Sequence, residues 1–153
     1  MFEEKVKEWV DKELIQEVHE VDHKGRYEFS LYLKTGAYGI HVYKVSETGP
    51  LIIETDVSLP PEVKTMLIDH PDSSHVETLL ISVLTNSPGR YAILDEEGKA
   101  CKIEEVDKIK LEKRLYPDVT QQQFMDSVMG IISASRFSAK VLEQYTQNVD
   151  SER

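Results

Sequence analysis

Three segments in which apolar and polar residues alternate constrain the fold of this chain most strongly. They are YEFSLYLK (27–34), IHVYKV (40–45) and LIIETDV (51–57), and the short breaks TGAYG and SETGP separate them. A period of two is the pattern of a strand with one buried face. Because turns this short connect antiparallel neighbours, the sequence predicts a three-stranded antiparallel sheet.

The second half of the chain predicts two or three further strands. RYAIL (90–94) and KACKI (99–103) flank the acidic turn DEEG and indicate a hairpin, and KIKLEKRLY (108–116) indicates another strand. In that last strand the apolar residues share one face: Ile109, Leu111 and Leu115. We interpret the basic residues around them as a solvated face: Lys108, Lys110, Lys113 and Arg114.

Helical spacing of apolar residues predicts four helices. The first begins at Phe2 and keeps the period as far as Val18, and a short one follows at PPEVKTML (60–67), where proline suits a first turn. The middle helix starts with a capping box at Ser74 and Glu77 and carries one apolar stripe: Val76, Leu79, Leu80, Val83 and Leu84.

The last helix is the longest of the four. Thr120 is in capping-box register with Gln123, and no proline interrupts the chain from there through Tyr145. A strip of small residues, which lets a helix approach a sheet closely, follows the helical period: Gly130, Ala134 and Ser138.

The order of these elements defines the expected fold class. We expect an α+β protein with an antiparallel sheet of about five strands, helices packed on it, and the order α-βββ-α-ββ(β)-α. No repeat or linker divides the 153 residues, so residues 1–148 should form a single domain followed by a frayed tail, 149–153.

Charge and composition disfavour several classes of partner. With 18 Lys and Arg against 28 Asp and Glu, the formal net charge is −10, which repels nucleic acid and anionic lipid. No apolar run is long enough to span a membrane, and the amphipathic start MFEEKVKEWV is not a signal peptide. With Cys101 as the only cysteine, we expect a cytoplasmic location. No glycine-rich phosphate-binding motif is present, and we expect no cofactor.

The stretch HEVDH fits the pattern H-E-x-x-H, which on a helix builds a zinc peptidase site. Such a site needs His19 and His23 on one side of a helix, with Glu20 between them. However, Lys24-Gly25 stops a helix directly after the second histidine, and the same stretch suits an edge strand. We therefore interpret the match as accidental and assign no metal ligand and no catalytic residue.

Other candidate sites have ordinary explanations. His70 and His75 flank a turn, where exposed histidines are common, and Cys101 lies in a predicted strand without a histidine fixed near it. We interpret Cys101 as a small core residue.

The order of elements resembles the fold of the type III secretion chaperones and of the YbjN-like proteins. The segment LYPDVTQQQFMDSVMGIISASR (115–136) resembles a family of uncharacterised archaeal proteins with this architecture, in its last strand, its turn with Asp and its Thr cap. The resemblance implies binding of polypeptide segments or a protein partner by sheet and helix surfaces, often as a homodimer through the middle helix. It implies no catalytic residues.

We therefore expect a non-enzymatic, chaperone-like module that binds a protein or peptide in the cytoplasm. The candidates for the partner or dimer interface belong to the middle helix: Val76, Leu79, Leu80, Ile81, Val83 and Leu84. Two alternatives stay open, a zinc-dependent hydrolase that uses HEVDH and a sensor domain whose curved sheet holds a small apolar ligand.

The apolar surface of the middle helix predicts a homodimer at micromolar concentration. Ile81 lies outside the main stripe, so Ile81→Lys should weaken the dimer and preserve the fold, whereas Leu80→Lys should damage folding by forcing a charge into the core. Light scattering measures the oligomeric state, and a monomer at every accessible concentration would contradict the prediction.

Overall fold

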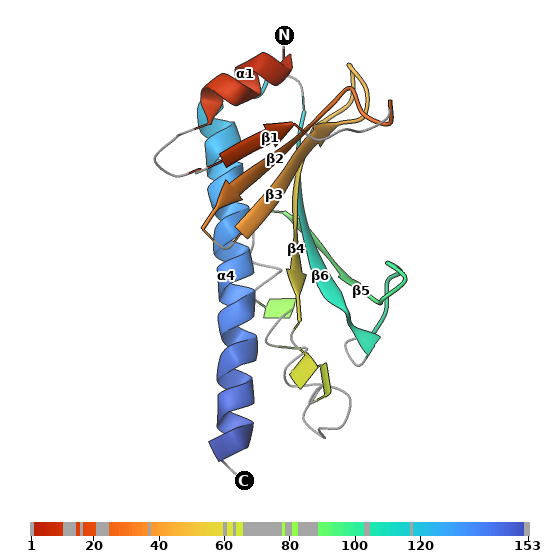
Figure 1. The fold of residues 1–153 in the computed structure, drawn as a ribbon, viewed down its shortest axis with the longest axis vertical. Coiled ribbons are helices and arrows are strands. Elements are labelled where there is room, and N and C mark those ends of the chain that lie inside the picture. Colours follow the sequence, from red (N-terminus) through yellow and green to blue (C-terminus); the bar gives the residue numbers. More distant parts are fainter. Residues whose placement is uncertain are drawn as a thin grey trace. The chain divides into compact units, whose positions relative to one another are not determined.

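A computed structural model of the chain describes residues 2–10, 15, 17–20, 25–36, 38–59, 61–62, 64–65, 78, 81–82, 89–102, 105–116 and 118–151. These residues form one open antiparallel sheet with the strand order β1-β2-β3-β4-β6-β5, together with the helices α1 and α4 (Figure 1). The helices are α1 (Phe2–Trp9) and α4 (Gln121–Ser151), and the strands are β1 (Glu17–Glu20), β2 (Phe29–Thr35), β3 (Tyr38–Lys44), β4 (Leu51–Ser58), β5 (Arg90–Leu94) and β6 (Lys108–Leu115). The predicted α+β class is confirmed, and the six strands are close to the expected five.

The chain divides into two compact units. Unit 1 comprises Met1–Thr55 and Glu112–Ile132, and unit 2 comprises Asp56–Leu111 and Ser133–Arg153. Each unit has a hydrophobic core of its own. The side chains of α4 are described as far as Gln144, and in the described residues no helix is both long and apolar enough to cross a membrane.

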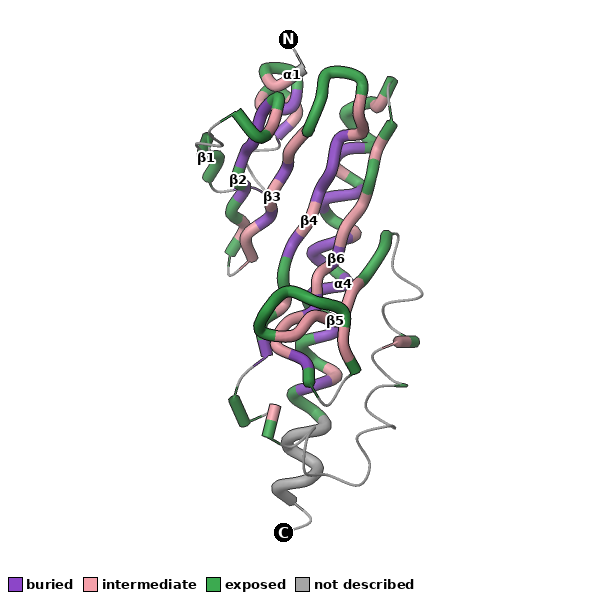
Figure 2. The backbone as a smooth tube through the Cα atoms, turned by 90° about the vertical axis from the view of Figure 1, so that its right-hand side faces the viewer, coloured by how far each residue is buried: buried purple, intermediate pink, exposed green. Residues whose placement is uncertain are grey.

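In unit 1 the core lies on one face of the sheet, which we call the inner face. The strands contribute every second residue, as Figure 2 shows for β2, where Leu31 and Leu33 are fully buried and Tyr32 between them is exposed. The core also contains Val6 of α1, Val10 directly after α1, and α4 residues such as Phe124, whose ring lies 6.0 Å from that of Trp9. The opposite, outer face carries the residues of the other parity.

The strands β2, β3 and β4 form the predicted antiparallel meander. Thr35 pairs with Tyr38 across a tight turn in which Gly36 has a φ of 57°, a conformation that glycine adopts without strain. The next turn is closed by a hydrogen bond from Gly49 N to Ser46 O of 3.1 Å. These short turns fix the register of all three strands.

The first helix is shorter than the sequence predicted. α1 ends at Trp9, and Glu17–Glu20 form the edge strand β1, which pairs antiparallel with β2. The apolar period that continues to Val18 fits a helix, but pairing with β2 satisfies backbone groups that a helix there would leave unpaired at the sheet edge. The edge-strand interpretation of HEVDH is therefore confirmed for its first two residues.

In unit 2 a second core forms around β6, where Ile109 and Leu111 are buried as predicted. The acidic turn after β5 is held by Asp95, whose Oδ1 accepts hydrogen bonds from the backbone N–H groups of Glu97 and Lys99. In the returning arm KACKI, Ala100 makes an isolated bridge to Leu94, and the described residues of this arm, 99–102, form no further strand. The sixth strand of the sheet is β1 instead.

The start of α4 confirms the predicted capping box. Thr120 Oγ1 accepts a hydrogen bond of 3.2 Å from Gln123 N, and Gln123 Oε1 accepts one of 2.9 Å from Thr120 N. Further along the helix Ala134 and Ser138 are buried, and the Ser138 hydroxyl donates to the Ala134 carbonyl. Of the small-residue strip, Ala134 and Ser138 thus occupy buried positions of unit 2.

The predicted middle helix lies mostly outside the described residues. Thr78, Ile81 and Ser82 are described and helical, and Ile81 is half-buried. Of the interface candidates, the others lie outside the described residues: Val76, Leu79, Leu80, Val83 and Leu84. In the predicted short helix, residues 61–62 and 64–65 are helical.

The core and cap positions of α4 predict the size of three substitution effects. Ala134→Leu should destabilise by about 1–3 kcal/mol because the buried site has no room for the larger side chain. Thr120→Ala should cost about 1 kcal/mol through loss of the cap. Urea unfolding measures both against Ala139→Leu, the same change at an exposed position of α4, which should stay within about 0.5 kcal/mol of the parent. An Ala134→Leu protein as stable as that control would contradict the packing described for unit 2.

Candidate functional site

The outer face of unit 1 carries a row of four ring and carboxylate side chains, one from each of four neighbouring strands. Antiparallel pairing places His19 opposite Tyr32, Tyr32 opposite His41, and His41 opposite Glu54. Paired residues point to the same face, and neighbouring strands lie about 4.8 Å apart, so the four side chains stand side by side. We call them the cross-strand row.

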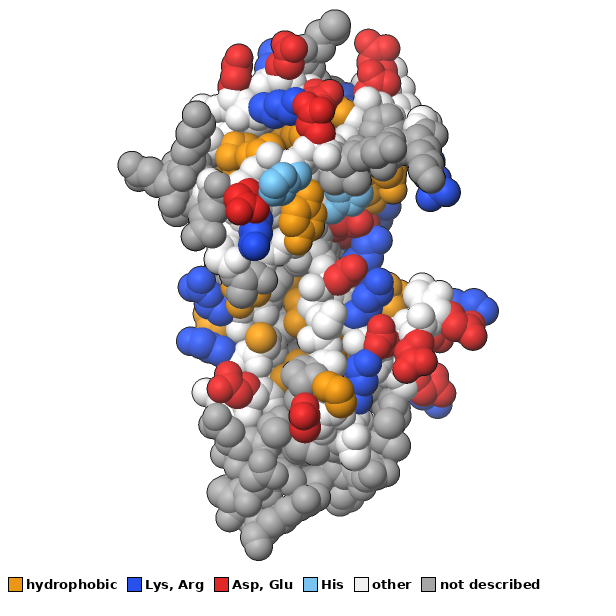
Figure 3. Space-filling view, in the orientation of Figure 1, with side chains coloured by type: hydrophobic (Ala, Val, Ile, Leu, Met, Phe, Trp, Pro, Cys, Tyr) orange, Lys and Arg blue, Asp and Glu red, His pale blue; other side chains and the backbone are white. Residues whose placement is uncertain are grey.

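Exposure falls along this row from the sheet edge inward. The side chain of His19 is 59% exposed, Tyr32 is 40% exposed, and the side chains of His41 and Glu54 are 25% and 17% exposed. In Figure 3 this face shows pale-blue histidine side chains with orange surface between them. The row is therefore an accessible surface at one end and a half-buried polar site at the other.

The hydroxyl end of the Tyr32 ring lies over Gly39 on β3. A Cβ atom added at Gly39 would stand 1.6 Å from the Tyr32 hydroxyl oxygen and 2.3 Å from its ring carbon Cζ, so no larger residue fits while the ring stays there. Such packing of an aromatic ring over a strand glycine stabilises a site that would otherwise lack a side chain. It also fixes the orientation of Tyr32, which is only part-buried.

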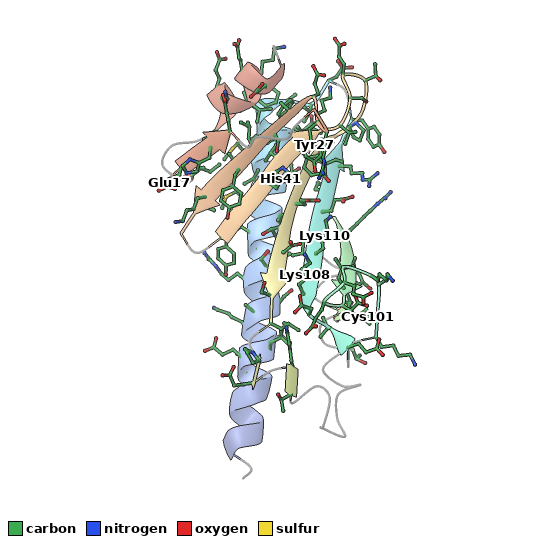
Figure 4. The ribbon with its side chains drawn as sticks, turned by 45° about the vertical axis from the view of Figure 1, so that its right-hand side comes forward. Glu17, Tyr27, His41, Cys101, Lys108 and Lys110 are labelled. Atoms are coloured by element: carbon green, nitrogen blue, oxygen red, sulfur yellow. The ribbon has the colours of Figure 1, made fainter. Side chains whose placement is uncertain are left out.

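Three rings pack together beside the row. His41 and Tyr43 stack with ring centroids 4.5 Å apart, and Tyr27 contacts both, at 5.7 Å from His41 and 4.9 Å from Tyr43. Figure 4 shows Tyr27 and His41 next to each other over β3. Tyr27 comes from the segment that precedes β2, so it joins the cluster from outside the strand ladder. These three residues are the ring cluster.

A polar network holds His41 on both of its nitrogens. Its Nε2 lies 2.5 Å from Ser30 Oγ, and its Nδ1 lies 3.5 Å from Glu54 Oε1. The imidazole thus contacts a hydroxyl through one nitrogen and a carboxylate oxygen through the other. The Tyr43 hydroxyl donates to the second oxygen of Glu54, at 3.0 Å.

The environment of Tyr43 disfavours loss of its phenolic proton. Burial raises the pKa of Tyr43, and the neighbouring Glu54 carboxylate raises it further through its negative charge and the hydrogen bond it accepts. Tyr43 therefore acts as a hydrogen-bond donor at every physiological pH.

The side-chain contacts from Ser30 to His41 and from His41 to Glu54 resemble those of a serine hydrolase triad. However, the surroundings of Ser30 do not suit acyl transfer. Ser30 is 3% exposed and lies within β2, between β1 and β3. The N–H groups of a strand lie in the plane of its sheet, so none points above the face to bind an oxyanion over Ser30 Oγ. The network instead fixes the rings of His41 and Tyr43.

The edge strand β1 is exposed at all four residues, as Figure 2 shows. Its side chains make two polar contacts. His19 Nε2 lies 2.9 Å from Glu17 Oε2, and this contact, followed by the charge of Lys34, lowers the pKa of Glu17. On the other side Lys7 of α1 donates to Glu20, which lowers the pKa of that carboxyl.

The zinc-site pattern is not helical where it is described. His19 and Glu20 are strand residues, so their side chains point to opposite faces of the sheet, and His23 lies outside the described residues. Among the described residues no three His, Cys, Asp or Glu side chains come together as a metal site. His70 and His75 also lie outside the described residues.

Two further sequence candidates lie in unit 2. Cys101 is half-buried, its thiol donates to the Ile93 carbonyl at 3.8 Å, and burial raises its pKa, all of which suit a packing role. On β6, where Figure 4 labels Lys108 and Lys110, the Lys108 ammonium lies 3.4 Å from Asp56.

The basic residues of β6 do not all lie on one face of the strand. We call Lys108, Lys110, Lys113 and Arg114 the basic stripe. By the alternation of a strand, Lys113 shares the parity of Ile109 and Leu111 and does not lie beside Lys108 and Lys110. In unit 1, Glu112 lies between the basic residues and accepts a hydrogen bond of 2.6 Å from Arg114. Acidic neighbours thus already contact part of the stripe.

Sequence reasoning did not identify the cross-strand row or the ring cluster as a site. Tyr32, His41, Tyr43 and Glu54 occupy polar positions of the three predicted strands, whereas Tyr27 occupies an apolar position and His19 lies before these strands. The signal was present: the tight turn at Gly36 sets the register of β2 and β3, and this register brings Tyr32 beside His41.

The raised pKa of Tyr43 predicts how the phenols titrate. A folded-state pKa above the unfolded value of about 10 stabilises the fold below that pH, and this stabilisation is lost as the pH rises above it. In an absorbance titration of the 7 tyrosines near 295 nm, one phenol should ionise late, together with unfolding. Tyr43→Phe should remove the late step, whereas Tyr91→Phe, at an exposed position of β5, should leave it.

Comparison with known proteins finds a similar fold but no matching family. No protein-family model matches the chain, and no curated protein matches it. Its structure is similar to the crystal structure of an uncharacterized protein from Methanothermobacter thermautotrophicus, with a TM-score of 0.79 and 11% sequence identity over 95% of this chain and 99% of that one. The expected likeness to an uncharacterised archaeal protein is therefore confirmed at the level of the fold.

Proposed function

We propose that this protein is a non-enzymatic, chaperone-like module of the cytoplasm that binds polypeptide segments on the outer face of unit 1. The observation that supports the proposal most is the cross-strand row together with the ring cluster. Helices cover the inner face of the same strands, whereas rings gather on the outer face, and Tyr32 is 40% exposed there.

Aromatic side chains are effective contacts for a partner polypeptide. Tyrosine offers a large apolar area with few rotatable bonds, so it loses little entropy when it is buried by a partner. Tyr32 is already oriented by Gly39, and His41 and Tyr43 are held by Ser30 and Glu54. A surface organised before binding costs less free energy to use.

The shape and charge of this surface favour a polypeptide over other ligands. Side chains that stand in rows on a sheet suit an extended segment, whereas small ligands are usually enclosed in concave pockets. The net charge of −10 opposes binding to nucleic acid. The resemblance to the secretion chaperones, seen in the order of elements, implies the same mode of action.

A homodimer through the middle helix belongs to the same proposal. Ile81 is the one interface candidate among the described residues, and it is half-buried. Part of its side chain is therefore accessible to a second copy of the chain. The Ile81→Lys variant thus tests self-association separately from peptide binding on the outer face.

Binding of short synthetic peptides, measured by fluorescence anisotropy, tests the proposed surface. Peptides with aromatic and basic residues should bind the parent protein, and Tyr32→Ala should weaken binding at least about fivefold because it removes the exposed tyrosine of the cross-strand row. Tyr91→Ala is the matched control, since Tyr91 is 37% exposed on a strand of unit 2.

A second variant tests whether binding depends on the position of the Tyr32 ring and not only on its presence. Gly39→Ala keeps Tyr32 but displaces it from the backbone of β3, and it should weaken binding as well. Circular dichroism and urea unfolding confirm that each variant is folded. Equal affinities of the parent and of folded Tyr32→Ala protein would exclude the outer face as the binding surface.

A further inference from the structure

We propose that the cross-strand row recognises the guanidinium group of an arginine in an extended segment of a partner polypeptide. The inference rests on the proposed function and names the side chain that the surface prefers. Its basis is the accessible ring of Tyr32, the groups beside it, and the distribution of charge around them.

Tyr32 offers an accessible ring to a planar cation. The hydroxyl end of the ring lies over Gly39, and the residue is 40% exposed, so a partner can reach part of the ring. A guanidinium is flat and weakly hydrated, and it stacks on an aromatic face with a cation–π attraction. An ammonium has the same charge but cannot stack, which gives a reason for arginine to bind better than lysine.

Histidines flank Tyr32 in the row, and carboxylates follow them on either side. His19 and His41 flank the ring on β1 and β3, and carboxylates lie beyond each of them: Glu17 next to His19, and Glu54 opposite His41. Lys34 is the cation on this face of β2, and it lies opposite Glu17, whose pKa its charge lowers. Of the two carboxylates, Glu17 has a side chain that is 51% exposed, and it can accept hydrogen bonds from the several N–H groups of a guanidinium.

The long-range field favours the same ligand. With a net charge of −10, the chain attracts basic segments before contact and repels acidic ones. In an extended segment every second side chain points to the same side, so arginines at alternate positions all face the partner surface. A segment in which arginine alternates with an apolar residue therefore suits this face.

Three acetylated nonapeptides test the inference with the full-length protein. They alternate valine with arginine, with lysine, or with citrulline, which has the shape of arginine without its charge. Amide shifts in ¹H–¹⁵N NMR spectra locate binding and give the affinity. The arginine peptide should shift residues of β1, β2 and β3, and it should bind about fivefold or more tightly than the citrulline peptide, with lysine between them.

Substitutions should change this preference in a defined way. Tyr32→Phe keeps a ring face and should keep the preference, whereas Tyr32→Ala should abolish it. Glu17→Gln should reduce the affinity for the arginine peptide, while Glu97→Gln, which removes the same charge from an exposed turn of unit 2, should have a smaller effect. The difference between these two variants separates a local contact from the general field of the protein.

The outcomes distinguish this inference from the proposed function. Equal binding of the arginine and citrulline peptides, both lost in Tyr32→Ala, would overturn the preference for arginine and leave a peptide-binding surface. Shifts confined to other parts of the protein, or an arginine preference that persists in folded Tyr32→Ala protein, would also overturn the inference. If the arginine preference persists in Tyr32→Ala protein, the proposed function is still decided by the separate anisotropy experiment. That experiment compares Tyr32→Ala with its control Tyr91→Ala, using the peptides with aromatic and basic residues.

Discussion

The register between β2, β3 and β4 is the constraint on which the rest of unit 1 depends. Two short turns fix it, and a shift of one residue would exchange the two faces of every strand. The same register that buries Leu31, Val42 and Ile53 on the inner face aligns Tyr32 and His41 on the outer one. The hydrophobic core and the candidate site are therefore two results of one pairing.

Within the site, His41 connects the components. It stacks on Tyr43, contacts Ser30 through one nitrogen and faces Glu54 with the other. Glu54 in turn accepts the hydrogen bond from Tyr43, so the ring pair and the carboxylate form a closed set of contacts. Such a set limits the rotation of each ring and keeps a half-buried carboxylate satisfied. Rigid positioning of rings is what a binding surface requires, whereas catalysis at Ser30 would also require donors above the sheet.

The parts of the fold that local chemistry determines could be predicted from the sequence. Alternation identified β2, β3, β4 and β6, and the capping box at Thr120 identified the start of α4. The boundary between α1 and β1 could not be predicted in this way. The residues near Val18 fit both a helical period and an edge strand, and pairing with β2, a contact distant in sequence, decided between them.

The candidate site escaped prediction for a related reason. A tyrosine or histidine at a polar position of a strand looks like any solvated residue until its cross-strand neighbours are known. Tyr32 acquires its role from Gly39 and His41, which lie on another strand. Of the interface candidates on the middle helix, Ile81 alone is among the described residues, so those candidates stay predictions.

The packing of Tyr32 on Gly39 has a spectroscopic consequence. The two α-protons of a glycine under a phenol ring experience its ring current, which separates their resonances from those of an ordinary strand glycine. Any event that lifts the ring, whether a ligand or a change in the strand, removes this displacement. Gly39 therefore serves as an intrinsic reporter of the state of the outer face, readable without a label on either partner.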